Sequence, residues 1–404
     1  MSTLKVACIG DSHFDEKNRL DDNVAVHRAF VEQAREAQVD VILHGGDFFE
    51  RRSTPAERNA LSEFLIHASS VAPVFGCKGN HDAEDDLDVF NFLDTANPMH
   101  LFQRPTEPRA PWDITLGDPS DPGAGFGVIA LPWFSKASIV AALPADTPAG
   151  TTTEATIRAA LGLLATLRLQ AEAFVKRGLV PLLVAHVQVA GSETSTGQTL
   201  VGTTVELAPN DILEVGCAYA SLGHIHKAQS WCDGRVAYSG SPQRHNFGES
   251  EAKGWNLVTI DTERWAEPGG VTVEFRELPA RKMLLIDMDW TKWHEGQPPG
   301  TSRIDYLQER GLIKDALVRL RYKINAEDLH LVDDSVIAAA FKEEGAHDIQ
   351  IETVVHHTDR VRCAEIVTAE SVWDKLVAYW NAKSIVVGAV DRERIKAKLG
   401  GLQQ

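Results

Sequence analysis

Aspartate, histidine and asparagine residues stand at the ends of apolar segments along this chain, and they constrain its fold more than any other feature. These residues lie in five short sequence motifs. Most of them come at or just after an apolar run that predicts a buried strand. Because strand ends can meet at one rim of a sheet, residues more than two hundred positions apart can be neighbours there. The eight side chains concerned are Asp11, His13, Asp47, Asn80, His81, His186, His224 and His226.

The chemistry of these side chains points to metal ions. Carboxylate, amide and imidazole groups without any cysteine suit a pair of hard to borderline divalent cations. Two cations held close together are a known arrangement for in-line attack on phosphorus. Asp47 follows two glycines and has two oxygens, so we expect its carboxylate to bridge the cations. Asn80 offers a neutral amide oxygen, and we expect the neighbouring His81 to face a bound phosphate.

Each signature taken alone has a simpler interpretation. Asp47 can cap a following helix, and Gly79 with Asn80 forms a common polar turn. A single histidine at a strand end is usually an ordinary surface group. The joint occurrence of all eight residues in similar settings outweighs these alternatives. The sequence therefore predicts a two-metal site.

The composition limits the class of protein. With 404 residues, the chain is long enough for two or three domains. It shows no basic leader segment and no apolar stretch near the ~20 residues that span a bilayer. Its five cysteines form no C-x-x-C pair, so we expect reduced thiols and a cytoplasmic protein away from the membrane. The net charge of -17 argues against nucleic-acid binding by bulk electrostatics, although bound cations would reverse the field locally.

Hydrophobic periodicity divides the chain into three regions. The first alternates strand and helix patterns, as an α/β layered domain does, and its runs 236–238 and 255–260 are expected to close a second sheet. The second has an α+β pattern with a further strand signal at 360–366. The third contains two helical segments. The predicted domains are residues 1–279, 280–368 and 369–404.

Two further motifs follow in the same part of the chain: LGHIHK at 222–227, and YSGSP at 238–242 with FGE at 247–249 and KG at 253–254. Together with the five signatures they resemble the calcineurin-like metallophosphoesterase superfamily. The closest branch is the SbcD-type nuclease subunit of the double-strand-break repair complex. The resemblance implies an α/β fold, a two-sheet sandwich flanked by helices, with a small α+β capping domain and a C-terminal helical tail.

The resemblance also implies roles for the site residues. Two Mn2+ ions are expected, with Mg2+ or another divalent metal as the alternative. One ion is implied to lie among Asp11, His13, Asp47 and His226. The other is implied to lie among Asp47, Asn80, His186 and His224, with Asp47 bridging. His81 is implied as the catalytic histidine, and Glu50, where the superfamily often has an acid, either orients His81 or is solvated.

The implied activity is that of a manganese-dependent exo- and endonuclease subunit at DNA ends in double-strand-break processing. The implied partners are DNA, an SbcC-like coiled-coil ATPase bound through residues 369–404, and a second copy in a homodimer. Alternatives left open are a stand-alone metallophosphatase or cyclic-nucleotide phosphodiesterase, and a non-catalytic scaffold. Four apolar residues near the C-terminus recur at the spacing of one helix face: Trp373, Leu376, Val377 and Trp380. Two interpretations of this face are left open, docking of a partner and packing in the core.

Some residues near the signatures are candidates for DNA contacts. Contacts to the phosphate backbone, which do not read sequence, are expected from Arg51, Arg52, Arg244 and His245. The alternative for each is a surface salt bridge. Base stacking is open to Phe14, Phe48 and Phe49, but we expect core packing for at least two of them.

Overall fold

A computed structural model of the chain describes residues 3–104, 112–115, 125–134, 152–198, 205–291, 311–357 and 364–400. Its helices and strands are β1 (Thr3–Ile9), α1 (Leu20–Ala37), β2 (Val41–His44), α2 (Pro55–Ser69), β3 (Val74–Cys77), η1 (Asp88–Phe92), β4 (Met99–Phe102), β5 (Trp112–Thr115), β6 (Gly125–Leu131), α4 (Thr152–Lys176), β7 (Val180–His186), β8 (Gln188–Val189), β9 (Glu206–Leu207), α5 (Pro209–Leu213), β10 (Tyr219–Gly223), β11 (Gln229–Trp231), β12 (Val236–Tyr238), β13 (Gly254–Asp261), β14 (Val271–Glu277), β15 (Met283–Asp289), β16 (Leu317–Asn325), η4 (Leu329–Leu331), α7 (Asp334–Glu343), β17 (Asp348–His356), α8 (Ala364–Thr368), α9 (Val372–Ala382) and α10 (Ala389–Gly400). The chain divides into a larger unit (Met1–Ile286, Ile304–Leu320 and Ala338–Gln350) and a smaller one (Asp287–Arg303, Arg321–Ile337 and Ile351–Gln404).

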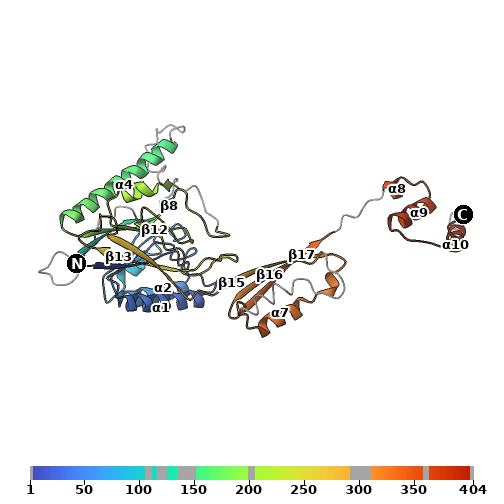
Figure 1. The fold of residues 1–404 in the computed structure, drawn as a ribbon, viewed down its shortest axis with the longest axis horizontal. Helices are drawn as coiled ribbons and strands as arrows, with labels where there is room; N and C mark the ends of the chain where they lie inside the picture. Colours follow the sequence, from blue (N-terminus) through green and yellow to red (C-terminus); the bar gives the residue numbers. More distant parts are fainter. Residues whose placement is uncertain are drawn as a thin grey trace. The chain divides into compact units, whose positions relative to one another are not determined.

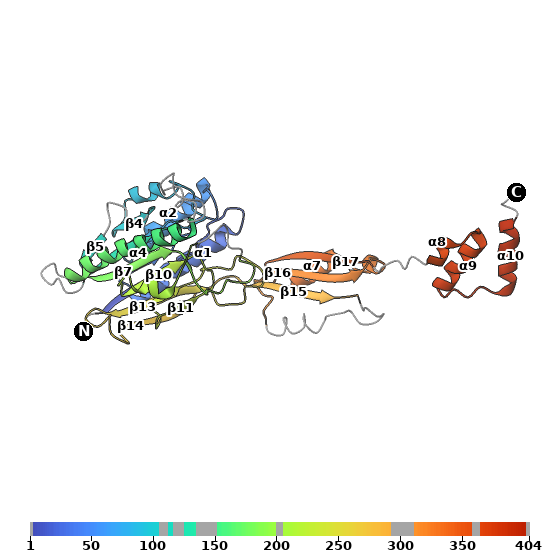
Figure 2. The same ribbon diagram turned by 90° about the horizontal axis from the view of Figure 1, so that it is seen from above.

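Two six-stranded sheets form the body of the larger unit (Figures 1 and 2). The first has the order β14-β13-β1-β2-β3-β4, and the second has the order β11-β12-β10-β7-β6-β5. In Figure 1, α1 and α2 lie on one side of the sheets and α4 lies on the other. The expected two-sheet sandwich flanked by helices is therefore confirmed.

Three buried clusters hold these layers together. In β1, Leu4, Val6 and Cys8 belong to the cluster between the sheets, whereas Ala7 and Ile9 belong to the cluster under α1 and α2. Successive side chains of a strand point to opposite faces, so one strand serves two layers. β6 and β7 divide in the same way between the inter-sheet cluster and the cluster under α4. Strands buried on both faces explain the continuous apolar runs in the sequence.

Two expectations about strands are wrong. β13 does not join the second sheet; it pairs antiparallel with β1 of the first, with Val6 opposite Val258. Its apolar pattern shows burial but does not name the strand beside it, which the tertiary fold decides. The strand expected at 360–366 is wrong at its end, where residues 364–366 begin α8, and residues 360–363 lie outside the described part of the chain. Short apolar runs do not distinguish a strand from a helix.

The carboxyl ends of the parallel strands meet at one edge of the sandwich. In the first sheet, Ile9 of β1 lies opposite His44 of β2, and in the second, Gly223 of β10 lies opposite His186 of β7. The two sheets come close at this edge, because a Cβ added to Gly45 would lie 2.7 Å from the backbone nitrogen of Gly223. Only glycine permits such an approach of two backbones. The loops that carry the signatures therefore converge.

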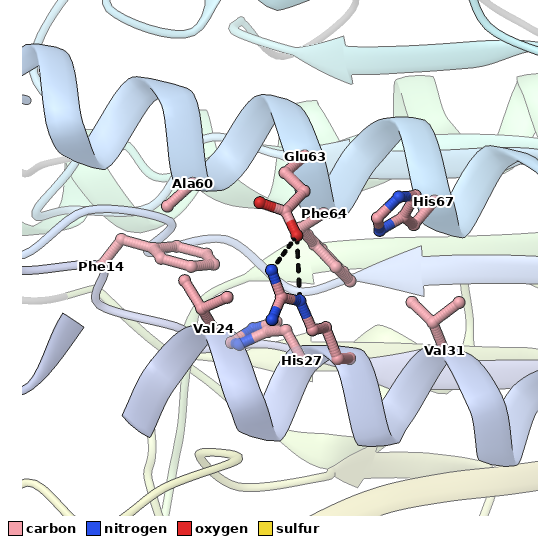
Figure 3. A pocket seen from close by; sticks show the side chains of 9 residues that line it. Phe14, Val24, His27, Val31, Ala60, Glu63, Phe64 and His67 are labelled. Carbon is pink, nitrogen blue, oxygen red and sulfur yellow. Dashed lines mark hydrogen bonds and ion pairs between the residues drawn. The ribbon is translucent and has the colours of Figure 1, made fainter. Parts of the chain in front are cut away.

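α1 and α2 pack side by side over the first sheet (Figure 3). Between them lies a cavity of about 10 Å³ whose lining includes Phe14, His27 and Phe64. Arg28 on α1 donates from Nε to Glu63 on α2 at 2.9 Å. A cavity of this size holds a single water at most, so it is not a ligand site. The core interpretation is confirmed for Phe14, Phe48 and Phe49, which are all fully buried.

A chain of buried hydrogen bonds ties α1 to the loops at the strand ends. His27 donates from Nδ1 to the carbonyl of Asn23 at 2.8 Å, so its neutral ring accepts at Nε2 from the hydroxyl of Ser12 at 2.7 Å. Ser12 then accepts from Nε2 of His44, also at 2.7 Å. His44 in turn accepts at Nδ1 from the backbone N–H of Gly46. Both histidines are thus neutral, with their tautomers fixed.

We expect this chain of bonds to make folding stability depend on pH. Burial lowers the pKa of His27 to about 4, against about 6.5 in an unfolded chain. Between these values the unfolded state binds more protons, so stability falls as pH decreases, by about 2 kcal/mol from about pH 7 to about pH 5. Urea unfolding in the presence of a chelator, repeated across this pH range, measures the change in unfolding free energy. In the variant His27→Gln, the unfolding free energy should change less with pH than in the parent. An equal pH dependence in both proteins would contradict the low pKa assigned to His27.

A separate three-stranded sheet has the order β15-β16-β17. On β16, buried side chains alternate with more exposed ones, so one face of this strand packs against a core. Near the C-terminus, the rings of Trp373 and Trp380 on α9 meet edge to face at 5.8 Å. The side chains of Lys396 and Arg392 on α10 lie over Trp373 and Trp380, respectively. Part of the apolar face of α9 is therefore covered by α10.

Two expectations from composition can be compared with the described residues. Cys8, Cys77, Cys217 and Cys232 are free thiols, as expected, and Cys363 lies outside the described part of the chain. Among the described residues, no helix combines the length and the apolar character needed to cross a bilayer.

Candidate active site at the strand ends

The loops after β1 and β2 run together beyond the sheet. The backbone N–H groups of Asp11 and His13 donate to the carbonyls of Gly46 and Asp47, at 2.9 and 3.0 Å. Four of the predicted site residues have a left-handed backbone, with φ of 53° at Asp11, 45° at His13, 53° at Asp47 and 109° at His224. Aspartate and histidine tolerate this region better than most residues, and such strain is typical of functional sites.

The structure brings all eight predicted residues together. A cleft of about 360 Å³ lies over them. Its lining includes six of the eight: His13, Asp47, Asn80, His81, His224 and His226. The other two, Asp11 and His186, are fully buried and contact the same cluster. Residues from five separate loops of both sheets therefore share one site.

The first group that can hold a cation consists of Asp11, His13 and His226, whose ligand atoms all lie within 4.8 Å of one another. Nε2 of His13 lies 3.1 Å from Nε2 of His226 and 3.7 Å from Oδ2 of Asp47. Two nitrogens each ~2.1 Å from one ion, at a right angle, would be about 3.0 Å apart. The two imidazoles are thus spaced as ligands of a common ion.

The second group lies on the other side of Asp47. Asp11, Asp47 and His186 place their ligand atoms within 4.8 Å, with Nε2 of His186 at 3.3 Å from Oδ2 of Asp47. Oδ1 of Asn80 lies 2.9 Å from Nε2 of His186 and 2.8 Å from Nδ1 of His224. His186 donates its other ring N–H to the carbonyl of Gly45 at 2.7 Å. This is the usual way in which a protein orients a histidine ligand.

The charges of the cluster call for a cation. Burial raises the pKa of Asp11 to about 6. Burial would lower the pKa of His13, but Glu50, Asp47 and Asp11 outweigh it and raise that pKa to about 9. The pKa of His186 is likewise about 9, because the attraction of Asp47 exceeds the effect of burial. The carboxylates thus favour the protonated rings of His13 and His186. Bound metal ions would supply this positive charge instead of the protons.

Among the described residues, the buried Oδ2 of Asp11 has no hydrogen-bond partner. A buried polar atom without a partner is costly and is often explained by an ion. The donor set, with carboxylate, amide and imidazole groups around a shared aspartate, fits a pair of divalent metals. The residues present therefore suit the metals that the sequence predicts.

His81 lies at the cleft with its backbone and ring both fixed. Its backbone N–H donates to Oδ1 of Asp47 at 2.8 Å, and its Nδ1 donates to the carbonyl of Glu50 at 2.9 Å. Nε2 is thereby the ring nitrogen left for a substrate. The carboxylate of Glu50 lies between the rings, 2.8 Å from Nδ1 of His13 and 3.7 Å from Nδ1 of His81. Glu50 is thus in contact with both histidines, and it is not simply solvated.

Asp82 belongs to the Gly79–Asp82 signature, yet its role was not foreseen. Its carboxylate is buried and accepts the backbone N–H groups of Phe49 and Gly79, at 2.9 and 2.8 Å. It therefore clamps the loop after β3 against the loop after β2. Its hydrogen bond to Phe49 joins two loops that are distant in sequence, so no local pattern indicates it.

Gly79 lets the same two loops approach, and we expect an alanine there to disrupt the site. A Cβ at Gly79 would collide with the backbone nitrogen and the carboxylate of Asp47. We expect Gly79→Ala to cost about 2 kcal/mol or more of unfolding free energy through this clash and to weaken metal binding. Gly162→Ala is the control, because open space surrounds that helical position and alanine should stabilise it by about 1 kcal/mol. Equal stability of the two variants would contradict the argument.

Two more side chains at the site could not be foreseen. The indole of Trp133 stacks on the ring of His224, with centroids 5.0 Å apart. Gln198 donates to the carbonyl of His224 at 2.7 Å and accepts from the N–H of His226 at 3.2 Å. Both come from loops far away in sequence and match no signature, so only the tertiary structure reveals them.

The residues expected to contact DNA lie in different settings. Arg51 lines the cleft and pairs with Asp15, and Arg52 is exposed. The guanidinium of Arg244 donates to four backbone carbonyls, among them those of Glu249 and Glu251. His245 lies against His13 and His226 at the floor of the cleft. A phosphate contact is therefore more accessible to the first two than to the last two.

One family model and two solved structures are similar to parts of this chain. Residues 4–133 match the family model of the calcineurin-like phosphoesterases. Among solved structures, the chain is similar to GAP50, the anchor in the inner membrane complex of Plasmodium, with 13% identity, a TM-score of 0.41, and coverage of 69% of this chain and 85% of that one. It is also similar to TT1561 of Thermus thermophilus, with 11% identity, a TM-score of 0.37, and coverage of 68% and 99%. The match of residues 4–133 to this family, together with a cluster of side chains that can bind metal, supports a metal-dependent phosphoesterase.

Proposed function

We propose that this protein is the nuclease subunit of an SbcD-type complex, which hydrolyses phosphodiester bonds at DNA ends with two Mn2+ ions. The observation that carries the proposal is the position of His81, beside a shared aspartate and along a cleft open to a substrate. One ion would be held by Asp11, His13, Asp47 and His226. The other would be held by Asp47, Asn80, His186 and His224.

Held by these residues, a pair of divalent cations would supply the Lewis acidity that activates a water and offsets charge on the phosphate. Because Nδ1 of His81 already donates to the carbonyl of Glu50, only the protonated ring carries a second proton, at Nε2, for the substrate. That proton stabilises the charge building on the phosphoryl oxygens or passes to the departing O3′. Glu50 keeps the rings of His13 and His81 in place.

The charges around the cleft support a phosphate substrate only locally. Arg51 and Arg52 stand on the loop that follows Asp47 and are exposed. Contacts from these side chains would position the backbone of DNA without reading its sequence. Because the whole chain carries a net charge of -17, we expect the cations themselves to dominate attraction at the site.

The test compares two substrates with the same protein and Mn2+. We expect cleavage of linear duplex DNA together with cleavage of a chromogenic phosphodiester. Activity on the small ester alone would instead favour a stand-alone phosphatase or cyclic-nucleotide phosphodiesterase. Absence of both activities, with metal bound, would leave a non-catalytic scaffold.

We also propose that residues 369–404 dock on the coiled coil of an SbcC-like ATPase. The described part of this segment leaves apolar side chains in solvent, with Val386 96% and Val390 70% exposed, although the tryptophans are partly covered. Such a patch is typical of an interaction surface. The sequence holds no G-x-x-x-x-G-K-[ST] motif, so any use of ATP has to come from a partner.

Co-purification with a coiled-coil ATPase tests this docking. Deletion of residues 369–404 should abolish it, and Val386→Asp should weaken it because the new charge would be buried at the interface. Ser384→Asp adds the same charge at a neighbouring exposed position and should bind normally. Binding that survives the deletion would overturn the proposal.

A homodimer through the outer faces of α1 and α2 is a further part of the proposed complex. These helices pack as a pair over the first sheet, and Ile66 on α2 is an exposed apolar side chain there. Light scattering of the isolated chain would show twice the monomer mass, and Ile66→Asp should shift it to the monomer.

A further inference from the structure

One imidazole at the site has no role in the signatures. His245 lies in the loop between β12 and β13, and its ring centroid is 4.8 Å from that of His13 and 4.9 Å from that of His226. The rings of His13 and His226 are themselves 4.9 Å apart. The ring centres of the three imidazoles thus form a nearly equilateral triangle.

This spacing is that of three imidazoles on one ion. A ring whose nitrogen lies ~2.1 Å from an ion has its centre about 3.3 Å from it, so two such centres lie about 4.6 Å apart at a right angle and about 5.3 Å apart at a tetrahedral angle. All three measured separations fall between these limits.

The hydrogen bonding of His245 is also that of a metal ligand. Its Nε2 is buried and has no hydrogen-bond partner among the described residues, so this nitrogen is free to bind an ion. A histidine that binds metal characteristically donates one ring N–H to a carbonyl or carboxylate and keeps the other nitrogen for the ion.

The loop that carries His245 is held rigidly. Arg244 donates to the carbonyls of Glu249 and Glu251, both at 3.0 Å. Glu249 accepts the backbone N–H of Asn246 at 3.1 Å and pairs with the buried Lys253 at 2.7 Å. The imidazole is therefore presented to the cluster without much freedom, as a site for an ion requires.

We propose that His245 is an additional ligand of the metal position formed by Asp11, His13, Asp47 and His226. That position then has three imidazoles and two carboxylates, and the third imidazole raises its affinity for borderline ions such as Zn2+, Co2+ or Fe2+ more than its affinity for Mn2+. The inference rests on the metal site of the proposed function, but not on its substrate.

Cobalt binding to the protein stripped with chelator tests the proposal without an activity assay. We expect two Co2+ per chain, with visible absorption from a nitrogen-rich site. In His245→Ala, the affinity of one of the two sites for Co2+ should fall by about 10-fold or more. The visible absorption of that site should change, and its affinity for Co2+ should exceed its affinity for Mn2+ by a smaller factor than in the parent. Added imidazole should restore the spectrum of the variant. Unchanged affinity and absorption in His245→Ala would overturn the proposal.

Two controls test whether a change in cobalt binding arises from the loss of the His245 imidazole. Asn246→Ala alters the next residue on the same cleft and should keep both cobalt sites. If His245→Ala fails to fold, as judged by thermal unfolding of the metal-free protein, His245→Gln replaces it, with the same expected loss. Failure to cut DNA by the metal-loaded parent would count against the proposed nuclease, whereas the cobalt spectrum would still report on His245.

Discussion

His81→Gln should lose about 100-fold to 10,000-fold of the rate of DNA cleavage while keeping both metal ions. The loss follows because glutamine has the hydrogen-bonding reach of the ring but cannot give up a proton to the leaving oxygen, and general acid catalysis is worth about that much. The backbone of His81, which donates to Asp47, is unaffected by the change. Steady-state cleavage of a labelled duplex measures the rate, and calorimetric titration with Mn2+ measures the binding.

The control for this variant is His67→Gln, which makes the same substitution at an exposed position of α2 and should cleave at the parent rate. Two results would contradict the role of His81. Cleavage by His81→Gln at the parent rate would remove it from the mechanism. Loss of metal in His81→Gln would make it a ligand, together with the neighbouring Glu50 and His13.

Asp47→Asn should weaken metal binding by more than about 100-fold and abolish measurable hydrolysis. Asp47 contacts both groups, at 3.3 Å from His186 and 3.7 Å from His13, so removing its charge affects both cations at once. Changes to side chains that merely support ligands already cost up to about 100-fold in affinity. Metal content after dialysis and calorimetric titration provide the measurement.

Asp233→Asn is a matched control, because Asp233 has φ of 55°, close to the 53° of Asp47, but is exposed. Asparagine tolerates a left-handed backbone as aspartate does, so both variants should keep the local fold. Parent metal affinity in Asp47→Asn would refute the bridging role. An equal loss in Asp233→Asn would show that the effect arises from the backbone and not from the lost charge.

The sequence determined which elements form and which end of each strand carries chemistry. Apolar runs at 5–9, 39–43, 71–77, 180–185 and 217–222 have strand length, and β1, β2, β3, β7 and β10 form there. Polar residues at or after the ends of these runs predicted the eight side chains of the site. Both inferences depend on local periodicity and on the rule that parallel strands align their ends. Core packing was predicted for at least two of Phe14, Phe48 and Phe49, and all three are buried.

Only the tertiary structure decided which residues from distant parts of the chain lie next to one another. The pairing of β13 with β1, the clamp of Asp82, the stacking of Trp133 on His224 and the approach of His245 to His13 all join residues from distant parts of the chain. Such contacts depend on which sheet a strand enters and on how far each loop reaches, and side-chain patterns within one segment hold no information about another. The sequence therefore specified the ligands one by one, and the packing of two sheets at shared glycines gave them a common centre.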